Sequence, residues 1–185
     1  MRRAALSWAA GLATLCAAAA QAQHRPQHQP YAGLEERPIK ALSDQQITDL
    51  KAGRGMGLAL AAELNGYPGP IHVLELAEPL GLTEAQRATV QSLYEAMKAE
   101  AVPLGERLIA QETDLERQFR ERSVSPASLS RATEAIGATQ ATLRAAHLKY
   151  HLSTVEALGP DQVRRYTELR GYGGGRAHRP RHEHR

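Results

Sequence analysis

The sequence has almost no cysteine and few aromatic side chains. Its single cysteine, Cys16, lies in an apolar run near the N-terminus, and aromatic residues make up 4% of the 185 residues. Trp8, in the same run, is the only tryptophan, and Phe119 is the only phenylalanine. The rest of the chain, without this apolar run, contains no cysteine. It can therefore form no disulfide and can offer no thiolate ligand to a metal. Its core must be built mainly from Ala and Leu, which suits helices packed in a thin layer.

Sequence motifs of catalysis are also missing. The glycine-rich stretch 53–57 follows no predicted strand and is not continued by Lys and Ser or Thr, as a phosphate-binding loop would be. No nucleophile motif is present. The sequence therefore predicts a protein that is not an enzyme.

The positive charge belongs to the ends of the chain. The formal net charge is +3, but without Arg2 and Arg3 the 23 Lys and Arg residues fall to 21, against 20 Asp and Glu. Four of the remaining arginines lie in the C-terminal tail: Arg176, Arg179, Arg181 and Arg185. Nucleic-acid binding needs a basic face with interleaved aromatics, and none is predicted here.

The N-terminus has the features of an export signal. Arg2 and Arg3 precede the apolar run 4–20, and Ala20-Gln21-Ala22 has the small-x-small pattern of a signal-peptidase site. The run is short for a membrane anchor and is followed by polar sequence. A lipoprotein is disfavoured because Leu15, before Cys16, is not small. We expect cleavage after Ala22 and a periplasmic protein.

Composition divides the rest of the chain into three parts. Residues 23–42 are rich in His, Gln and Pro and are expected to form a disordered arm. Residues 43–171 carry helical patterns and are expected to form one domain. Residues 172–185, rich in Gly, His and Arg, are expected to form a disordered tail.

Helix-starting residues and apolar periodicity predict the helices. Apolar side chains recur at steps of three and four from Val90 to Phe119, which indicates one long helical face. Pro103 lies within it and costs about 3 kcal/mol, so a bend without a break is expected. We predict helices over 43–51, 56–63, 71–77, 83–122, 126–157 and 160–169.

Two long helices joined by a short linker predict an all-α fold built on an antiparallel helical hairpin. The short helices would flank this hairpin. A two-helix layer has little interior of its own, so the short helices or a second subunit must cover it. We therefore expect a homodimer.

A five-residue motif, called the phrase below, occurs twice in the sequence and is the basis of a family resemblance. Leu82-Thr83-Glu84-Ala85-Gln86 opens the first long helix, with Thr83 and Gln86 as a capping box. Leu158-Gly159-Pro160-Asp161-Gln162 opens the last helix, with Gly159 at the cap and Pro160 at the first helical position. Two such phrases bracketing a helical hairpin resemble the Spy/CpxP group of periplasmic proteins and the related heavy-metal sensors of the CnrX and ZraP kind. The resemblance covers residues 71–171.

A histidine pair is the sharpest candidate site. His147 and His151 are spaced i, i+4 on a predicted helix, so both imidazoles project from one face and can share a metal ion. The resemblance implies a histidine ligand near this place, and a further H-x-x-x-H pair where His72 stands, with Leu76 at its second position. Glu75 or Glu95 could complete the set. In the alternative interpretation, both histidines are ordinary interface residues.

Further histidines lie near the ends of the chain. His24 and His28 are spaced by four, and the tail holds His178, His182 and His184. Such tracts bind Zn(II), Cu(II) or Ni(II) weakly, because imidazole suits all three ions. The alternative is a solvated, pH-responsive tail.

These observations and the resemblance lead to three functional hypotheses. The first is an envelope-stress or heavy-metal-resistance accessory protein that binds a divalent ion, such as Zn, Cu, Ni or Co, and senses or buffers it. The second is an ATP-independent chaperone of the Spy kind, a holdase whose partners are unfolded periplasmic clients. The third is an adaptor that binds a membrane-bound regulator.

Overall fold

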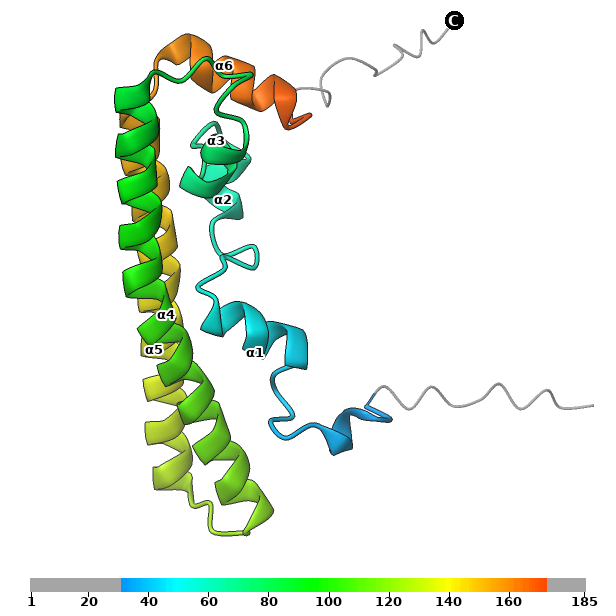
Figure 1. Ribbon diagram of the computed structural model, residues 1–185. Helices are drawn as coiled ribbons and strands as arrows, with labels where there is room; N and C mark the ends of the chain where they lie inside the picture. Colours follow the sequence, from blue (N-terminus) through cyan, green and yellow to red (C-terminus); the bar gives the residue numbers. More distant parts are fainter. Residues whose placement is uncertain (1–30, 173–185) are drawn as a thin grey trace, which may run out of the picture. The chain divides into compact units, whose positions relative to one another are not determined.

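A computed structural model describes residues 31–172 of the chain. The predicted signal peptide, most of the predicted arm and nearly all of the predicted tail lie outside the described residues. The chain divides into two compact units, of which the second begins at Gly33 and holds the helices of the described residues (Figure 1). These helices are η1 (Leu34–Glu36), α1 (Asp44–Lys51), α2 (Leu60–Glu63), α3 (Pro70–Glu75), α4 (Glu84–Arg120), α5 (Pro126–Glu156) and α6 (Pro160–Leu169).

The predicted all-α fold and helical hairpin are confirmed. Residues 31–172 contain no strand, and α4 and α5 pack along each other. Pro103 lies inside α4, which continues through it as one helix. The linker ends with Ser125, whose side chain accepts a hydrogen bond from the backbone N–H of Ser128, and Pro126 occupies the first turn of α5. Each helix of the hairpin thus begins at the residue that its sequence indicates.

The two copies of the repeated phrase meet in space. The capping box of Thr83 and Gln86 forms as predicted, with both hydrogen bonds at 3.1 Å. The Gln86 amide also donates to the side-chain oxygen of Gln162 at 2.8 Å, and the Gln162 amide donates back to Gln86 at 3.0 Å. Gln162 in turn accepts from the backbone N–H of Gly159, at the cap of α6. One amide pair therefore joins the first turns of α4 and α6.

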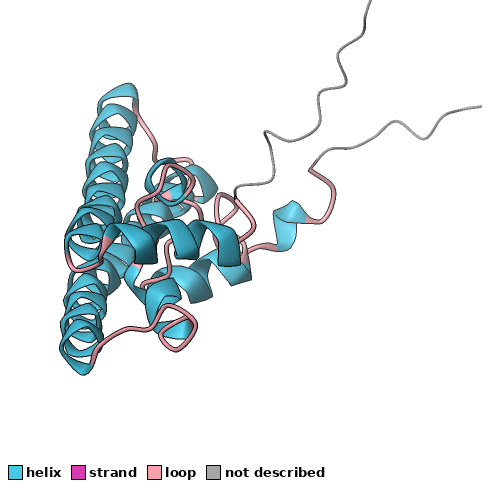
Figure 2. Ribbon diagram, turned by 90° about the horizontal axis from the view of Figure 1, so that it is seen from above, coloured by secondary structure: helices cyan, strands magenta, loops and turns pink. Residues whose placement is uncertain are grey.

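The short helices cover one side of the hairpin (Figures 1 and 2). α1 and α3 contact α4, while α2 and α3 contact α5. They close two separate hydrophobic clusters over the long helices. The α1 cluster consists of Ile39, Leu42, Leu50, Ala101, Leu108, Ile136 and Leu143. The α6 cluster consists of Val73, Leu80, Val90, Leu158 and Tyr166.

A glycine allows α1 to approach α4 closely. A Cβ atom at Gly105 would overlap the carbonyl oxygen of Leu50 and would lie 2.9 Å from its carbonyl carbon. The obstructing atoms belong to the backbone at the end of α1 and cannot turn aside as a side chain would. Gly105 therefore sets the distance between the two helices.

Two predicted boundaries need correction. The disordered arm was expected to reach residue 42, but Ile39 and Leu42 are buried in the α1 cluster, and η1 precedes them. Their apolar side chains tie this stretch to the hairpin. The helix predicted over 56–63 spans only Leu60–Glu63, because Met56 and Gly57 have positive φ values of 44° and 86° that a right-handed helix cannot contain.

None of the helices between residues 31 and 172 is long and apolar enough to cross a membrane.

Candidate metal centre

His147 and His151 lie one turn apart on α5, and both are buried. Their exposed fractions are 2% and 8%. In the sequence they come after Leu143 of the α1 cluster and before Leu158 of the α6 cluster, which follows the end of α5. Because the i, i+4 spacing puts both rings on one helix face, the pair occupies the interior between the two hydrophobic clusters.

A backbone carbonyl fixes the tautomer of His151. Its Nδ1 atom lies 2.7 Å from the carbonyl oxygen of Tyr67. Since a carbonyl oxygen only accepts, Nδ1 carries the proton and Nε2 keeps a lone pair in the neutral ring. Metal-binding histidines are oriented in this way, with the second nitrogen donating to a carbonyl or a carboxylate. His151 is therefore arranged to offer Nε2 as a ligand.

The His147 ring has a nitrogen without a partner. Its Nε2 atom is buried and forms no hydrogen bond with any described residue. Burial, followed by the charge of His151, lowers the pKa of His147, so the ring is neutral at pH 7. A neutral imidazole is the form that binds a metal ion. Leaving a buried polar atom unpaired costs about 1–3 kcal/mol, which a bound ion would relieve.

Two glycines bring the backbone close to these rings. A Cβ atom at Gly69 would lie 2.9 Å from Cε1 and 3.0 Å from Nε2 of His151. Gly69 is itself held between Pro68 and Pro70, both buried. A Cβ atom at Gly55 would lie 3.6 Å from Nδ1 of His147, in ordinary contact. The space beside the His151 ring therefore depends on a residue that has no side chain, whereas a side chain at Gly55 would fit beside His147.

A buried carboxylate lies beside the pair, with its Oε2 atom 3.8 Å from Nδ1 of His151. Glu63, at the end of α2, is 8% exposed. Its Oε1 atom accepts hydrogen bonds from the hydroxyls of Tyr166 and Tyr172, and its Oε2 atom accepts from the backbone N–H of Gly69 at 3.2 Å. Arg170 lies 3.5 Å from the same carboxylate and balances its charge. Glu63 holds the Gly69 turn in place, and its oxygens are already engaged.

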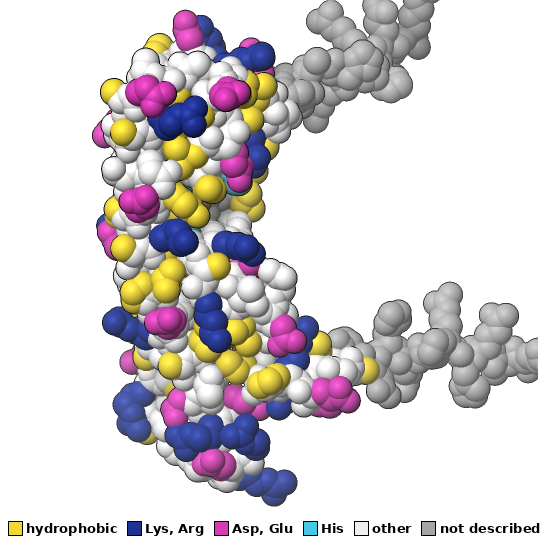
Figure 3. Space-filling view, viewed as in Figure 1, with side chains coloured by type: hydrophobic (Ala, Val, Ile, Leu, Met, Phe, Trp, Pro, Cys, Tyr) yellow, Lys and Arg dark blue, Asp and Glu magenta, His cyan; other side chains and the backbone are white. Residues whose placement is uncertain are grey.

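The pocket in front of the pair has a volume of about 170 Å³. His147, His151 and His72 all line it, and so do Met56 and Met97. His72, on α3, is half-buried, and its Nδ1 atom lies 2.9 Å from a carboxylate oxygen of Glu75. On the face drawn in Figure 3, histidine takes up only a small spot of the surface.

His72, His147 and His151, the three histidines predicted as ligands, all line this one pocket. Glu75 contacts His72 but does not line the pocket, and Glu95 instead accepts a hydrogen bond from Gln91. Within residues 31–172, no three His, Cys, Asp or Glu side chains are grouped closely enough to hold a metal ion. The end histidines, His24, His28, His178, His182 and His184, lie outside the described residues.

Sequence reasoning missed three residues of the pocket. Glu63 lies in an Ala- and Leu-rich stretch, and nothing in that stretch indicates that its carboxylate is buried. Met97 fits the apolar face of α4 and was interpreted as core. Met56 was placed in a helix. One signal was available, because the sequence has three methionines and the two that follow Met1 both line this pocket.

The chain was also compared with known proteins. It matches no protein-family model, no curated protein and no solved structure.

Proposed function

We propose that this chain is an exported metal-binding protein whose site is the pocket in front of His147 and His151. The observation that carries the proposal is the concentration of histidine there. Fewer than a tenth of the residues from 31 to 172 line the pocket, yet they include all three histidines of that stretch. Histidine is the commonest metal-binding side chain in proteins.

The state of the two rings supports the proposal further. A buried histidine that serves packing alone normally has both polar atoms satisfied or exposed. Here Nε2 of His147 has no partner among the described residues, while the Nδ1 atom of His151 is engaged by a carbonyl oxygen and its Nε2 atom is not. The pair therefore supplies two nitrogen donors in one pocket, with His72 as a third histidine of its lining.

The biological role that we propose follows the resemblance to the Spy/CpxP group. A metal-binding helical hairpin exported to the periplasm would buffer heavy-metal ions or sense them for a partner in the envelope. The His-rich ends would capture ions weakly, and the interior pair would hold one ion tightly.

The test is calorimetric titration of Zn(II), Ni(II), Co(II) and copper into the chain that begins at Gln23. Replacing the five end histidines by Gln in all samples removes binding by the ends. We expect one tight site, lost in His147→Leu. Because Leu fills the ring volume without an unpaired nitrogen, the ion-free variant should unfold at the same temperature or a higher one. Equal affinity in His147→Leu and the parent would contradict the proposal.

A holdase is the second candidate function, favoured by apolar side chains that the fold leaves uncovered. Leu60, Leu64, Phe119 and Leu152 are each more than half exposed. They lie on α4, on α5 and on or directly after α2, so they would offer dispersed contacts to an unfolded client. Suppression of client aggregation that is equal in the parent and in His147→Leu would favour this function. The expected dimer stays a prediction, which light scattering would test.

A further inference from the structure

The pocket contains two side chains that a purely imidazole site would not need. Met56 and Met97 are the only methionines after Met1, and they come from different parts of the fold. Met97 projects from α4 with 6% of its surface exposed, between Val90 of the α6 cluster and Ala101 of the α1 cluster. Both methionines therefore line the same small pocket as the two buried imidazoles.

Met56 sits in an unusual backbone conformation. Its φ is 44°, in the left-handed region that non-glycine residues rarely adopt, and its side chain is 41% exposed. It stands between Gly57 and Gly55, where a Cβ atom would lie 3.6 Å from Nδ1 of His147. Neither burial nor backbone preference explains a methionine at this point. Strained residues of this kind gather at ligand sites.

Apart from the Glu63 carboxylate, the donor side chains that line the pocket are imidazoles and thioethers. Thioethers favour Cu(I), whereas carboxylates and water suit harder ions. The nearest carboxylate, Glu63, is engaged by two tyrosine hydroxyls and a backbone N–H and is balanced by Arg170. Four neutral donors leave the full charge of the ion in a buried place. Because the cost of burying an ion rises with the square of its charge, a monovalent ion is favoured over a divalent one.

We propose that the pocket is a Cu(I) site, with His147, His151, Met97 and Met56 as its ligands. The inference rests on the proposed function and specifies its ion. No cysteine occurs after residue 16, so soft coordination in this chain falls to methionine. A thioether cannot form a disulfide, which suits an oxidising compartment. Met56, the exposed ligand, lies where the ion enters and leaves.

The test compares Cu(I) with Zn(II) under anaerobic, reducing conditions, with a chromogenic Cu(I) chelator and a fluorescent Zn(II) chelator as competitors. The protein is the chain from Gln23 with its five end histidines replaced by Gln. The variants are Met97→Leu and Met56→Leu, which keep apolar volume. Leu152→Met, on the exposed face of α5, controls for adding or removing a thioether elsewhere.

We expect each pocket variant to lose at least tenfold in Cu(I) affinity. Zn(II) affinity should stay within about twofold, because Zn(II) relies on nitrogen ligands. X-ray absorption of the Cu(I) form should detect sulfur neighbours that are reduced in Met97→Leu. Met56→Gly, which relieves the left-handed strain, keeps the Met56 test valid if Met56→Leu fails to fold.

Two other results distinguish the Cu(I) inference from the proposed metal-binding function on which it rests. If divalent ions bind and are lost in His147→Leu, but the methionine variants keep full Cu(I) affinity, the Cu(I) inference is wrong and the metal-binding function stands. If His147→Leu changes the affinity of no ion, both are wrong.

Discussion

The α1 cluster and the α6 cluster pack against the same two long helices in different ways. The α1 cluster is apolar throughout, and its closest approach is between backbones, where Gly105 meets the carbonyl group of Leu50. The α6 cluster is tied by polar contacts, from the Gln86–Gln162 amide pair to the Tyr166 hydroxyl that donates to Glu63. Close packing stabilises one end of the hairpin, and hydrogen bonds stabilise the other.

The pocket between the two clusters shows neither the apolar packing of the α1 cluster nor the paired polar contacts of the α6 cluster. On α4, Val90 belongs to the α6 cluster and Ala101 to the α1 cluster, with Met97 between them. On α5, the histidine pair occupies the corresponding stretch. Polar atoms in the α6 region find partners, whereas Nε2 of His147 has none among the described residues. Gln111 Oε1 and Gln118 Oε1, farther along α4, also lack a partner among the described residues, so the contrast is between the fully paired α6 region and the rest of the hairpin.

The largest expected effect comes from breaking the close approach in the α1 cluster. Gly105→Ala forces α1 away from α4, because the new Cβ atom overlaps a carbonyl oxygen that cannot move alone. We expect a loss of about 2–3 kcal/mol in the free energy of unfolding. Urea denaturation followed by circular dichroism measures it.

Gly137 supplies the matched control. It lies inside α5, and a Cβ atom there would meet nothing within 4 Å. Gly137→Ala should therefore stabilise the protein by about 0.5–1 kcal/mol, the helix-propensity difference. Equal effects at the two glycines would contradict the role given to Gly105.

The next effect is expected in the polar contacts of the α6 cluster. Tyr166→Phe removes a hydroxyl donor from a buried carboxylate, although Tyr172 and Gly69 still donate to Glu63. We expect a loss of about 2 kcal/mol, measured in the same way. Tyr94→Phe, on α4 and not bonded to Glu63, should change stability by less than about 0.5 kcal/mol.

The contact between Tyr166 and Glu63 also predicts that the free energy of unfolding depends on pH. Burial, and then the Glu63 carboxylate, raises the pKa of Tyr166 far above its ordinary value. In the unfolded chain, tyrosine ionises near pH 10. Since the folded pKa is the higher one, the contribution of Tyr166 is complete below about pH 10 and is lost above it, where only the unfolded chain releases the proton. The stability difference between the parent and Tyr166→Phe should shrink from pH 8 to pH 11. A difference that stays constant would contradict this linkage.

A smaller effect is expected for the amide pair. Gln162→Ala removes both hydrogen bonds to Gln86 and one to the backbone N–H of Gly159. We expect a loss of about 1 kcal/mol. A double-mutant cycle with Gln86→Ala should give a coupling of at least about 0.5 kcal/mol. If the effects of the two substitutions on stability simply add, Gln86 and Gln162 do not interact.

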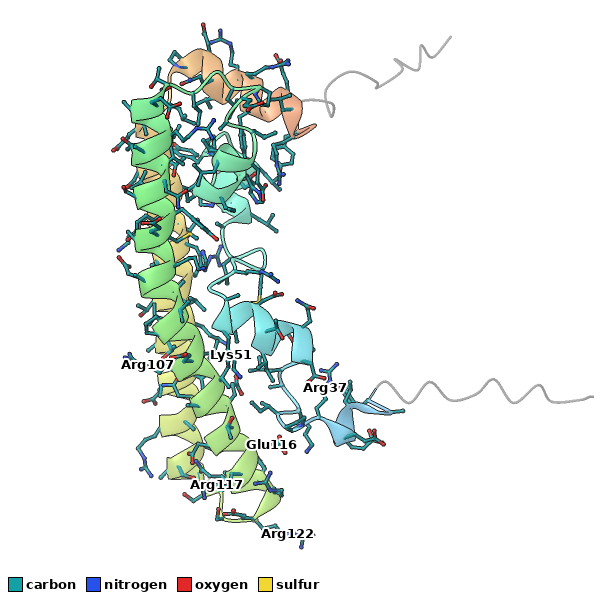
Figure 4. All side chains as sticks on the ribbon, viewed as in Figure 1. Arg37, Lys51, Arg107, Glu116, Arg117 and Arg122 are labelled. Atoms are coloured by element: carbon teal, nitrogen blue, oxygen red, sulfur yellow. The ribbon has the colours of Figure 1, made fainter. Side chains whose placement is uncertain are left out.

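The smallest effect lies beyond both clusters, near the turn between α4 and α5. Figure 4 places Arg117 and Arg122 there. Arg117 pairs with Asp114 and Glu121, and all three side chains are about half exposed. Arg117→Ala should cost less than about 0.5 kcal/mol, and less still in high salt. Thermal unfolding at low and high salt measures this.

Much of the fold could be predicted from the sequence because its helices begin at capping residues. The helix expected over 160–169 is α6 itself, and the one expected over 83–122 is α4 to within two residues at each end. The helix expected over 56–63 was wrong at Met56. Its left-handed φ arises from the tertiary setting of the loop, and apolar composition does not reveal it.

Local spacing could predict the candidate site only where its residues are neighbours along the chain, and His72 was named from the family resemblance instead. His147 and His151 share a helix face, so their spacing was sufficient. Glu63 lies far from both in sequence, and its burial depends on Tyr166, 103 residues away. Met56 and Met97 meet the histidines only through packing of the loop and of α4 against α5. Such long-range contacts leave no local period to detect.

The amide pair between Gln86 and Gln162 has a consequence for the order in which the protein opens. A ten-residue helix such as α6 is marginal alone. Because its third residue shares both amide hydrogen bonds with the first turn of α4, fraying at either helix removes a partner from the other. Backbone amides in these two turns, 76 residues apart, should therefore exchange with solvent deuterium as one cooperative unit.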